Sequence, residues 1–387
     1  MSSFFGAPCR AGLLPALFGY GGNGMDSDGE KSGAAQTNAK KKIPTMLSGK
    51  SPDKVLLIQL KQLGDILMTT PSIRALHRSD PTTEIHYLTQ SSASRVVANN
   101  PYLSKVVTVS AKPGIKETAT LLFRLRRENY SVVIDFMGQP GTALACRLIG
   151  GRKRIGFKKR GRSPFYTHAV EPPLRVEYSA QKKLHLLSVL GITSDDTKLD
   201  FFPREKDRHT AKSILRRLGA KTGRPLVSVS PVSKRDYKVW PAEYFAEICD
   251  YLVARYQAQI LFLWGPGEIR FVEKVKARMK KPSLPYYDVP TIAETAGLLE
   301  SVDLHIGNDN GPMHFAIACG TSTVAIFGRP LSKNWTPPGS SRHLSVEFDP
   351  GCKRDCFYPK CGLECLTLLK PEMVIKMIDA TPLIFLD

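Results

Sequence analysis

The sequence predicts an α/β protein made of two Rossmann-like lobes, each built on a parallel sheet, that face one interdomain cleft. Three observations support this fold class. The chain has 387 residues, enough for two domains that each bury a core. From residue 54 onward, short runs rich in Val, Ile and Leu alternate with longer amphipathic segments. A charged, irregular stretch between residues 193 and 223 separates two such series.

The first series predicts the first lobe. Strands are expected at residues 54–60, 84–89, 105–109 and 131–136. Helices are expected between them at residues 66–78, 92–99, 115–129 and 141–149. Because strand and helix alternate strictly, each crossover returns the chain to the same edge, and the sheet is expected to be parallel.

The second series repeats this pattern. Strands are expected at residues 225–230, 259–263, 302–306 and 322–327, with helices at 242–255, 268–279, 292–299 and 312–319. We therefore expect a first lobe over residues 51–205 and a second over 206–387. Gly, Ser, Asn and Lys dominate residues 19–50 without apolar periodicity, so residues 1–50 are expected to be a disordered tail.

The composition limits the classes of partner and the compartment. A net charge of +20 favours anionic partners: nucleic acid, acidic lipid headgroups or phosphorylated substrates. Eight cysteines are too few for a disulfide scaffold of this length, and buried reduced thiols suit a cytoplasmic enzyme. The apolar runs are far shorter than the roughly 20 residues that a membrane-spanning helix needs.

The end of the first predicted strand carries the first candidate site. Gly64 permits a tight turn, and Asp65 then stands at the start of a helix with its carboxylate toward the cleft. Asp65 is either a helix N-cap or a catalytic carboxylate, and the segment alone does not decide between them. A dinucleotide site is a poorer match because this segment, after the first predicted strand, lacks G-x-G-x-x-G.

Two candidate sites follow strands of the second lobe. Lys238 lies in a basic loop that can meet phosphates or can simply be solvated. Glu268 follows Gly265 and Gly267, and it can accept hydrogen bonds from ribose hydroxyls or can interact with the helix dipole.

The segment 305–316 is the most specific candidate. Its strand ends in small polar residues, and Gly311-Pro312 opens an apolar helix whose free backbone N–H groups can bind a diphosphate. Asp309 is expected to bond neighbouring loop or sugar groups. His314 faces inward one turn along, where a histidine is more often a core residue than a catalytic one.

Taken together, these segments resemble glycosyltransferase family nine, the ADP-heptose:lipopolysaccharide heptosyltransferases, which have the two-lobed GT-B fold. The resemblance rests on residues 61–65 with 69–71, 238–241, 307–314, and 327–328 followed by 335–337. The first of these segments is most similar to the subgroup that adds the third, branching heptose.

The resemblance implies a role for each candidate. Asp65 would be the base that deprotonates the acceptor hydroxyl, in an inverting reaction that uses no metal and no cofactor. Glu268 would bind the ribose and Asp309 would position the donor phosphate and sugar. The residues expected to hold the ADP diphosphate are Lys238, Asn310, Gly311, Met313 and His314. Candidates for the acceptor side are Lys61, Gln62, Thr69, Arg152 and Lys158.

The implied partners are an ADP-sugar donor, expected to be ADP-heptose, and the inner core of lipopolysaccharide. The basic segment 147–162 suits an anionic acceptor on the inner leaflet, so the enzyme is expected in the cytoplasm, peripheral on the inner membrane. No nucleic-acid partner is expected, because the basic residues are not interleaved with stacking aromatics. Two alternatives remain: a nucleotide-sugar 2-epimerase on the same fold and a nucleic-acid-binding protein.

A C-terminal cluster of four cysteines, Cys352, Cys356, Cys361 and Cys365, has close spacing of the kind seen in zinc sites. The short C-x₂-C spacing and a histidine within the cluster are missing, so reduced structural thiols are favoured over a metal.

Overall fold

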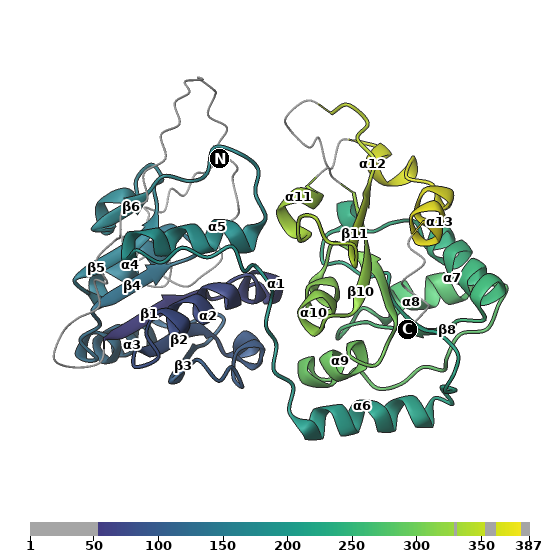
Figure 1. Ribbon diagram of the computed structural model, residues 1–387, viewed down its shortest axis with the longest axis horizontal. Coiled ribbons are helices and arrows are strands. Elements are labelled where there is room, and N and C mark those ends of the chain that lie inside the picture. The colour runs from purple at the N-terminus through teal and green to yellow at the C-terminus, as the bar shows by residue number, and fades with distance from the viewer. Residues whose placement is uncertain (1–52, 329–330, 353–360, 381–387) are drawn as a thin grey trace, which may run out of the picture.

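The computed structural model describes residues 53–328, 331–352 and 361–380. The predicted disordered tail, residues 1–50, lies outside the described residues. Two separate sheets, each covered by helices, form two lobes that lie side by side (Figure 1). The predicted fold class is therefore correct.

The first lobe is built on a six-stranded parallel sheet in the order β3-β2-β1-β4-β5-β6. The strands are β1 (Lys54–Ile58), β2 (Glu84–Gln90), β3 (Lys105–Val109), β4 (Val132–Asp135), β5 (Lys153–Phe157) and β6 (His168–Val170). The four predicted strands are present. The sequence pattern missed β5 and β6, which complete one side of the sheet and lie within or near the basic segment.

Helices of the first lobe include one correction. The predicted helix 66–78 is two helices, α1 (Leu63–Leu67) and α2 (Thr70–Ser79). The chain turns between them because the hydroxyls of Thr69 and Thr70 donate back to the carbonyls of Ile66 and Leu67, each at 2.7 Å. The remaining helices are η2 (Ser91–Val96), α3 (Ile115–Arg127), α4 (Pro140–Ile149), η3 (Ser163–Phe165), α5 (Ser179–His185) and η4 (Leu186–Leu190).

The second lobe has a five-stranded parallel sheet in the order β11-β10-β9-β7-β8. Its strands are β7 (Leu226–Ser230), β8 (Gln259–Phe262), β9 (Leu304–Asn308), β10 (Ser322–Phe327) and β11 (His343–Glu347), of which only β11 was not predicted. Its helices are α6 (Glu205–Arg217), η5 (Asp236–Lys238), α7 (Ala242–Tyr256), α8 (Ile269–Lys276), α9 (Ile292–Leu299), α10 (Gly311–Cys319), α11 (Ser332–Trp335), α12 (Glu364–Thr367) and α13 (Pro371–Asp379).

The stretch between the lobes is more ordered than its charge suggested, because it contains helix α6. Helix α6 packs closely on α9: a Cβ at Gly297 of α9 would lie 2.9 Å from the Cβ of Ala211. The predicted division between residues 205 and 206 thus falls at the first residue of a helix that packs with the second lobe.

The linker before α6 is bound to the first lobe through one buried arginine. Arg74 of α2 is 4% exposed, donates to the Oδ1 of Asp196 at 2.9 Å and to the carbonyl of Lys198 at 2.8 Å, and pairs with Asp200. The linker then reaches the second lobe, where the rings of Phe201 and Phe315 meet edge to face with centroids 5.1 Å apart.

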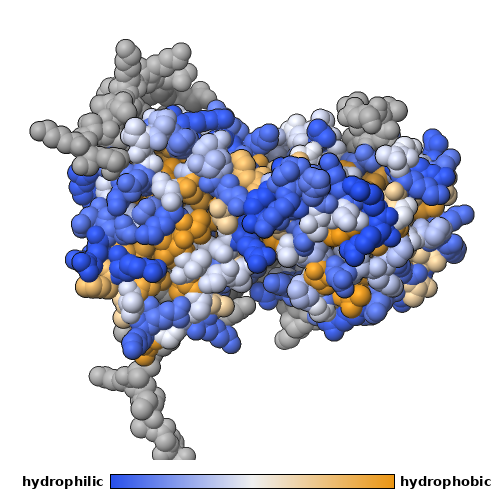
Figure 2. Space-filling view, turned by 90° about the horizontal axis from the view of Figure 1, so that it is seen from below, coloured by the Kyte–Doolittle hydropathy of each residue, from blue (hydrophilic) through white to orange (hydrophobic). Residues whose placement is uncertain are grey.

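The surface is unevenly apolar. Figure 2 shows one face of the molecule, with a larger hydrophobic area on the first lobe than on the second. Large apolar side chains exposed on the first lobe include Ile115 and Phe123 of α3, Leu148 of α4, and Leu174 and Val176 after β6. None of the helices described here combines the length and the apolar character that crossing a membrane requires.

Candidate active site

Helices α1 and α10 bring the two lobes together. Each begins within a few residues of the carboxyl end of an interior strand, α1 after β1 and α10 after β9. In parallel sheets this is the edge at which loops gather to bind ligands. Figure 1 shows α1 at the side of the first lobe that faces the second. The predicted sites around Asp65 and Asp309 are therefore on the facing edges of the two sheets.

Gly64 of α1 and His314 of α10 approach each other closely at this boundary. A Cβ placed on Gly64 would lie 2.3 Å from Cδ2 of His314 and 3.0 Å from its Nε2. Gly64 is buried within α1 and does not have a positive φ. The expected reason for this glycine, a tight turn, is wrong: the glycine leaves room for the imidazole of the opposite lobe.

Asp65 is not the N-cap of its helix. That position belongs to Gln62, whose backbone is extended and whose side chain makes no capping bond. Asp65 is the third residue of α1, half-buried, and none of the described residues donates a hydrogen bond to its side chain. The carboxylate is thus oriented by its helix and is free to accept a proton or a hydroxyl.

The charge of Asp65 reaches across the boundary to His314. Burial lowers the pKa of His314, and the carboxylates of Asp309 and Asp65 partly oppose this effect. His314 is 5% exposed, its Nδ1 has no hydrogen-bond partner within the described ranges, and its ring lies 5.8 Å from that of Trp335. The buried imidazole of His314, whose Nδ1 has no partner among the described residues, is therefore subject to the charges of both candidate carboxylates.

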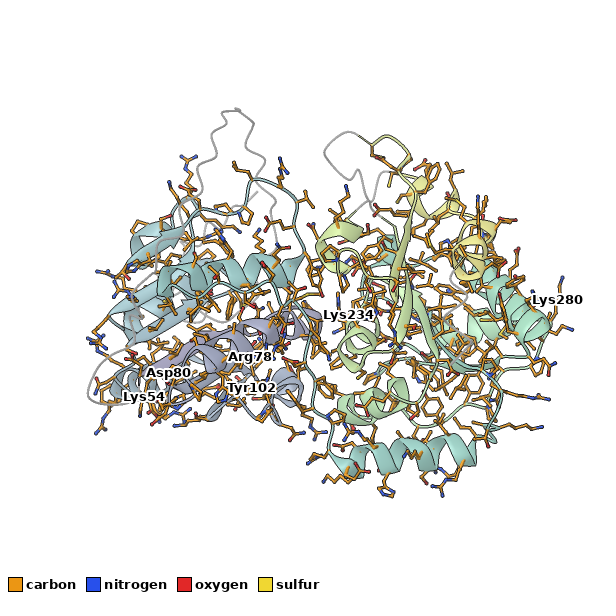
Figure 3. All side chains as sticks on the ribbon, in the orientation of Figure 1. Lys54, Arg78, Asp80, Tyr102, Lys234 and Lys280 are labelled. Atoms are coloured by element: carbon orange, nitrogen blue, oxygen red, sulfur yellow. The ribbon has the colours of Figure 1, made fainter. Side chains whose placement is uncertain are left out.

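The second lobe holds a cation and a carboxylate in direct contact. The ammonium of Lys238, at the end of η5, forms an ion pair with the carboxylate of Asp309, which is 9% exposed. Exposed Lys234, in the same loop, lies where this lobe approaches the first one (Figure 3). Cations thus border the edge of the sheet beside α10.

Asn310 organises the start of α10. Its side-chain oxygen accepts the N–H of Met313 at 3.2 Å, and its amide donates to the carbonyl of Val232 at 2.9 Å and to Oγ of Ser230 at 3.0 Å. The N–H of Met313 is therefore already used and Pro312 has none. In the part of the chain that the structure describes, the N–H of Gly311 has no partner, so it is the open donor at this helix start.

Glu268 lies at the start of α8, and one of its two carboxylate oxygens is used within the loop that precedes this helix. It is the N-cap residue of α8, and its Oε2 accepts the backbone N–H of Gly265 at 2.8 Å, which closes the turn between them. Its other oxygen has no hydrogen-bond donor among the described residues.

Sequence reasoning did not identify Asn308 or His305 as supports of the site. Asn308 is fully buried, and its Oδ1 accepts the N–H of Trp240 at 3.1 Å, which joins β9 to the segment after Lys238. His305 is also fully buried; its Nδ1 lies 2.9 Å from Oγ of Ser228, and burial lowers its pKa to about 3. The one feature of the sequence that could have identified these two residues is that they are polar side chains within an otherwise apolar strand.

The acceptor-side candidates separate into different places. Lys61 and Gln62 lie beside Asp65, but Thr69 is fully buried and bonds Ile66 and the hydroxyl of Tyr87, so it faces the core. Lys158 follows β5, on the same edge of the sheet as Asp65, where it pairs with Glu171.

Arg152 precedes β5 and pairs at 3.2 Å with Asp53, which precedes β1. It therefore lies at the opposite edge of the sheet from Asp65. In the same segment, the guanidinium of Arg154 is occupied by the carbonyls of Phe165 and Gly151. The basic segment is thus divided between the two edges of the sheet.

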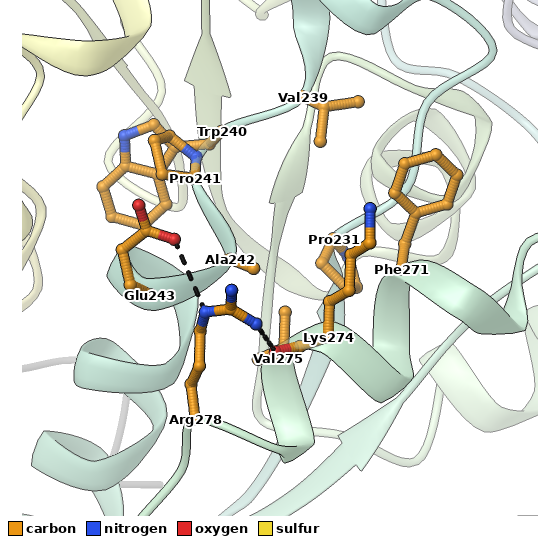
Figure 4. Close-up of a pocket in the computed structure, with 10 residues that line it drawn as sticks. All are labelled: Pro231, Val239, Trp240, Pro241, Ala242, Glu243, Phe271, Lys274, Val275 and Arg278. Carbon is orange, nitrogen blue, oxygen red and sulfur yellow. Dashed lines mark hydrogen bonds and ion pairs between the residues drawn. The ribbon is translucent and has the colours of Figure 1, made fainter.

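A pocket of about 290 Å³ on the second lobe lies next to the loop before α7 (Figure 4). Its lining is mainly apolar with two cations and one carboxylate: Pro231, Val239, Trp240, Pro241, Ala242, Glu243, Phe271, Lys274, Val275 and Arg278. None of the predicted site residues lines this pocket. We therefore place the candidate site at the boundary between the two lobes.

The described residues contain no group of three or more His, Cys, Asp or Glu side chains that could hold a metal. Cys352, Cys361 and Cys365 form no disulfide, and Cys356 lies outside the described residues.

Two facing lobes, each built on a parallel sheet covered by helices, make up a two-lobed architecture of the GT-B type. Residues 119–365 match the family model for glycosyltransferase family 9 (heptosyltransferase). The chain therefore belongs to glycosyltransferase family 9. This confirms the family resemblance and the transferase class, and it decides against the epimerase and the nucleic-acid-binding protein.

Individual relatives agree with this assignment. The chain is 26% identical over 287 residues to lipopolysaccharide heptosyltransferase 3 of Escherichia coli K12, covering 71% of this chain and 82% of that protein. A family 9 glycosyl transferase from Veillonella parvula superposes with a TM-score of 0.77 at 22% identity, over 87% of this chain and 98% of that one. The E. coli heptosyltransferase WaaC with ADP-2-deoxy-2-fluoro heptose has a TM-score of 0.62 at 19% identity, over 84% and 99%.

Proposed function

We propose that this enzyme transfers a heptose, or a closely related sugar, from an ADP-sugar to the inner core of lipopolysaccharide, with inversion and without a metal. The observation that carries the proposal is the position of Asp65, a carboxylate without a described hydrogen-bond donor, beside the contact between Gly64 and His314 of the donor lobe. A relative is named lipopolysaccharide heptosyltransferase 3, and a structure of similar fold holds an ADP-heptose analogue.

In this proposal Asp65 is the general base. The acceptor hydroxyl attacks the anomeric carbon on the face opposite the bond to ADP, that bond breaks, and the carboxylate of Asp65 takes the hydroxyl proton. A carboxylate is a weak base in water, so the proton moves late, as the attacking oxygen gains positive character. A half-buried carboxylate held by a short helix suits this step because its orientation is fixed before substrate binds.

The second lobe meets the charge that develops on the departing ADP. Lys238 and the N–H of Gly311 bind the diphosphate, while the side chain of Asn310 and the backbone of Met313 hold the helix start in shape. Asp309 holds the Lys238 ammonium in place and contacts the sugar. The free oxygen of Glu268 accepts a ribose hydroxyl, and His314 closes the site against Gly64.

The acceptor enters over the first lobe. Lys61, Gln62 and Lys158 lie along the carboxyl edge of its sheet, where they can contact anionic core sugars. Leu174 is fully exposed and Val176 is 65% exposed in the segment after β6. Apolar side chains next to a basic loop favour a peripheral position on the anionic inner face of the inner membrane, in the cytoplasm.

The proposal is tested by incubating truncated lipopolysaccharide with ADP-heptose, and in parallel with other nucleotide sugars, followed by mass spectrometry of the glycolipid. A gain of one heptose mass with ADP-heptose is expected. Nucleotide release without any gain in glycolipid mass would refute the transfer. If the glycolipid gains mass only with another nucleotide sugar, that nucleotide sugar is the donor in place of ADP-heptose.

A further inference from the structure

Lys183 of α5 is a buried lysine with few partners. Its side chain is 7% exposed, and its Nζ donates to Oε1 of Gln59 at 3.0 Å. It forms no ion pair with any described carboxylate, and its Nζ lies 5.8 Å from the centre of the Phe136 ring. Its neighbour Lys182 is exposed on the same helix.

Burial of an ammonium is unfavourable unless charge and hydrogen bonds compensate for it. Burial accordingly lowers the pKa of Lys183, while the carboxylates of Asp65 on α1 and Asp135 on β4 oppose this and the ammonium of Lys182 adds to it. These three groups are the charges that act on Lys183 from the elements around it.

Asp135 is already satisfied. It is fully buried at the end of β4, and its oxygens accept four hydrogen bonds from the N–H groups of Met137 and Gly138 and the hydroxyls of Thr142 and Tyr166. Asp65 receives none from the described residues. Among the carboxylates that act on Lys183, Asp65 is therefore the one whose charge has no other compensation.

A chain of hydrogen bonds also joins Lys183 to the turn that carries Asp65. Gln59 is 3% exposed directly after β1; its Oε1 accepts from Lys183, and its Nε2 donates to the carbonyl of Lys61 at 2.5 Å. Helix α1 begins two residues later, at Leu63. Lys183 thus fixes the amide of Gln59, and Gln59 fixes the backbone that leads into α1.

We infer that Lys183 is a positioning residue for Asp65: through Gln59 it holds the turn that leads into α1. The inference rests on the proposed role of Asp65 as the base. It assigns a function to a residue that touches neither substrate.

The test compares Lys183→Met with the matched control Lys182→Met. Methionine keeps the length of the side chain but removes the charge and the donor. With Lys183→Met we expect kcat to fall about 10- to 100-fold, because loss of positioning by about 1 Å can cost a factor of that size. The donor KM should change less than about two-fold, and Lys182→Met should change none of these quantities.

Melting temperature separates this role from a purely structural one. Replacing a buried ammonium by an apolar side chain is often neutral or stabilising, so Lys183→Met should melt no lower than about 4 °C below the wild type, the shift for ~1 kcal/mol in a domain of this size. Lys183→Gln, which stays neutral but keeps an amide donor, serves as the second variant. It should show a smaller loss of kcat than Lys183→Met, because it keeps a hydrogen-bond donor for Gln59.

The outcomes are distinguishable. Absence of sugar transfer by the wild type refutes the proposed function. An unchanged kcat in Asp65→Asn refutes the role of Asp65 as the general base. If both hold, a folded Lys183→Met enzyme with wild-type kcat, or one whose donor KM changes as much as its kcat, overturns the inference about Lys183 alone.

Discussion

Replacing Asp65 by Asn removes one proton acceptor and leaves almost every described contact intact. No described residue donates a hydrogen bond to the Asp65 side chain, and the N-cap of α1 is Gln62. The expected loss of stability is therefore only that of a carboxylate in the first turn of a helix, about 0.3–1 kcal/mol. In a domain of this size that corresponds to a fall in Tm of roughly 4 °C or less.

The effect on turnover should be far larger. A positioned general base contributes about 10²- to 10⁴-fold, or about 2.7–5.4 kcal/mol of barrier at 1.36 kcal/mol per factor of ten. We expect kcat to fall by that factor in a coupled assay of ADP release, while the Kd for ADP from calorimetry stays within about two-fold. Asp195→Asn is the matched control, because Asp195 is an exposed aspartate of the linker. Near-wild-type turnover of Asp65→Asn, or an equal loss in Asp195→Asn, would end the catalytic assignment.

Three further experiments test other parts of the structure. Gly64→Ala should lower Tm by about 2–10 °C and also reduce kcat, because its Cβ would lie 2.3 Å from His314. The double variant Gly64→Ala with His314→Ala should recover the Tm that Gly64→Ala loses. A double variant with a Tm as low as that of Gly64→Ala would contradict the contact between these two residues. The double variant Lys158→Gln with Lys159→Gln should raise the acceptor KM more than the donor KM. Arg152→Gln, at the opposite edge of the sheet, should alter neither KM. An equal rise of the acceptor KM in the double variant and in Arg152→Gln would contradict the division of the basic segment. Burial lowers the pKa of His305 to about 3, so the folded protein binds fewer protons than the unfolded chain between about pH 6.5 and 3. The contribution of His305 to the free energy of unfolding is therefore lost as pH falls through that window. In His305→Asn, the free energy of unfolding should depend less on pH in this range, as measured by circular dichroism during acid titration. A pH dependence equal to that of the wild type would contradict this role of His305.

Strands that form apolar runs in the sequence were predictable, including the edge strands β3 and β8, whereas β5, β6 and β11 were not. Strands β1, β4, β7 and β9 lie inside their sheets with every or nearly every residue buried, so they appear as continuous apolar runs. Strands β6 and β11 are at sheet edges, and β5 beside β6 starts with Lys153 and Arg154, which are only half-buried. Their polar residues hide the pattern on which a strand prediction depends.

The site was predictable only as far as it follows strand ends. Asp65, Lys238 and Asp309 each follow or flank an interior strand, so their common edge could be derived from the alternation of strands and helices. The contact between Gly64 and His314 depends on how the two lobes dock, which no local pattern encodes. Lys183 stands next to Lys182 in the sequence, and only the packing of α5 on the first lobe makes one of them buried and the other exposed.

The bound linker sets the way in which the cleft can open. Arg74 holds the chain to the first lobe as far as Asp200, and Asn99 extends this attachment by donating to the carbonyl of Phe202 at 3.1 Å. Helix α6, which packs on the second lobe, begins at Glu205, so the shortest unattached part of this connection is residues 203–204. Phe201, just before this unattached part, packs on Phe315 of α10, so the connection between the lobes lies next to the helix start where the diphosphate is proposed to bind. If the lobes rotate about this connection to admit the proposed glycolipid acceptor, the side of the boundary away from α10 is expected to widen most.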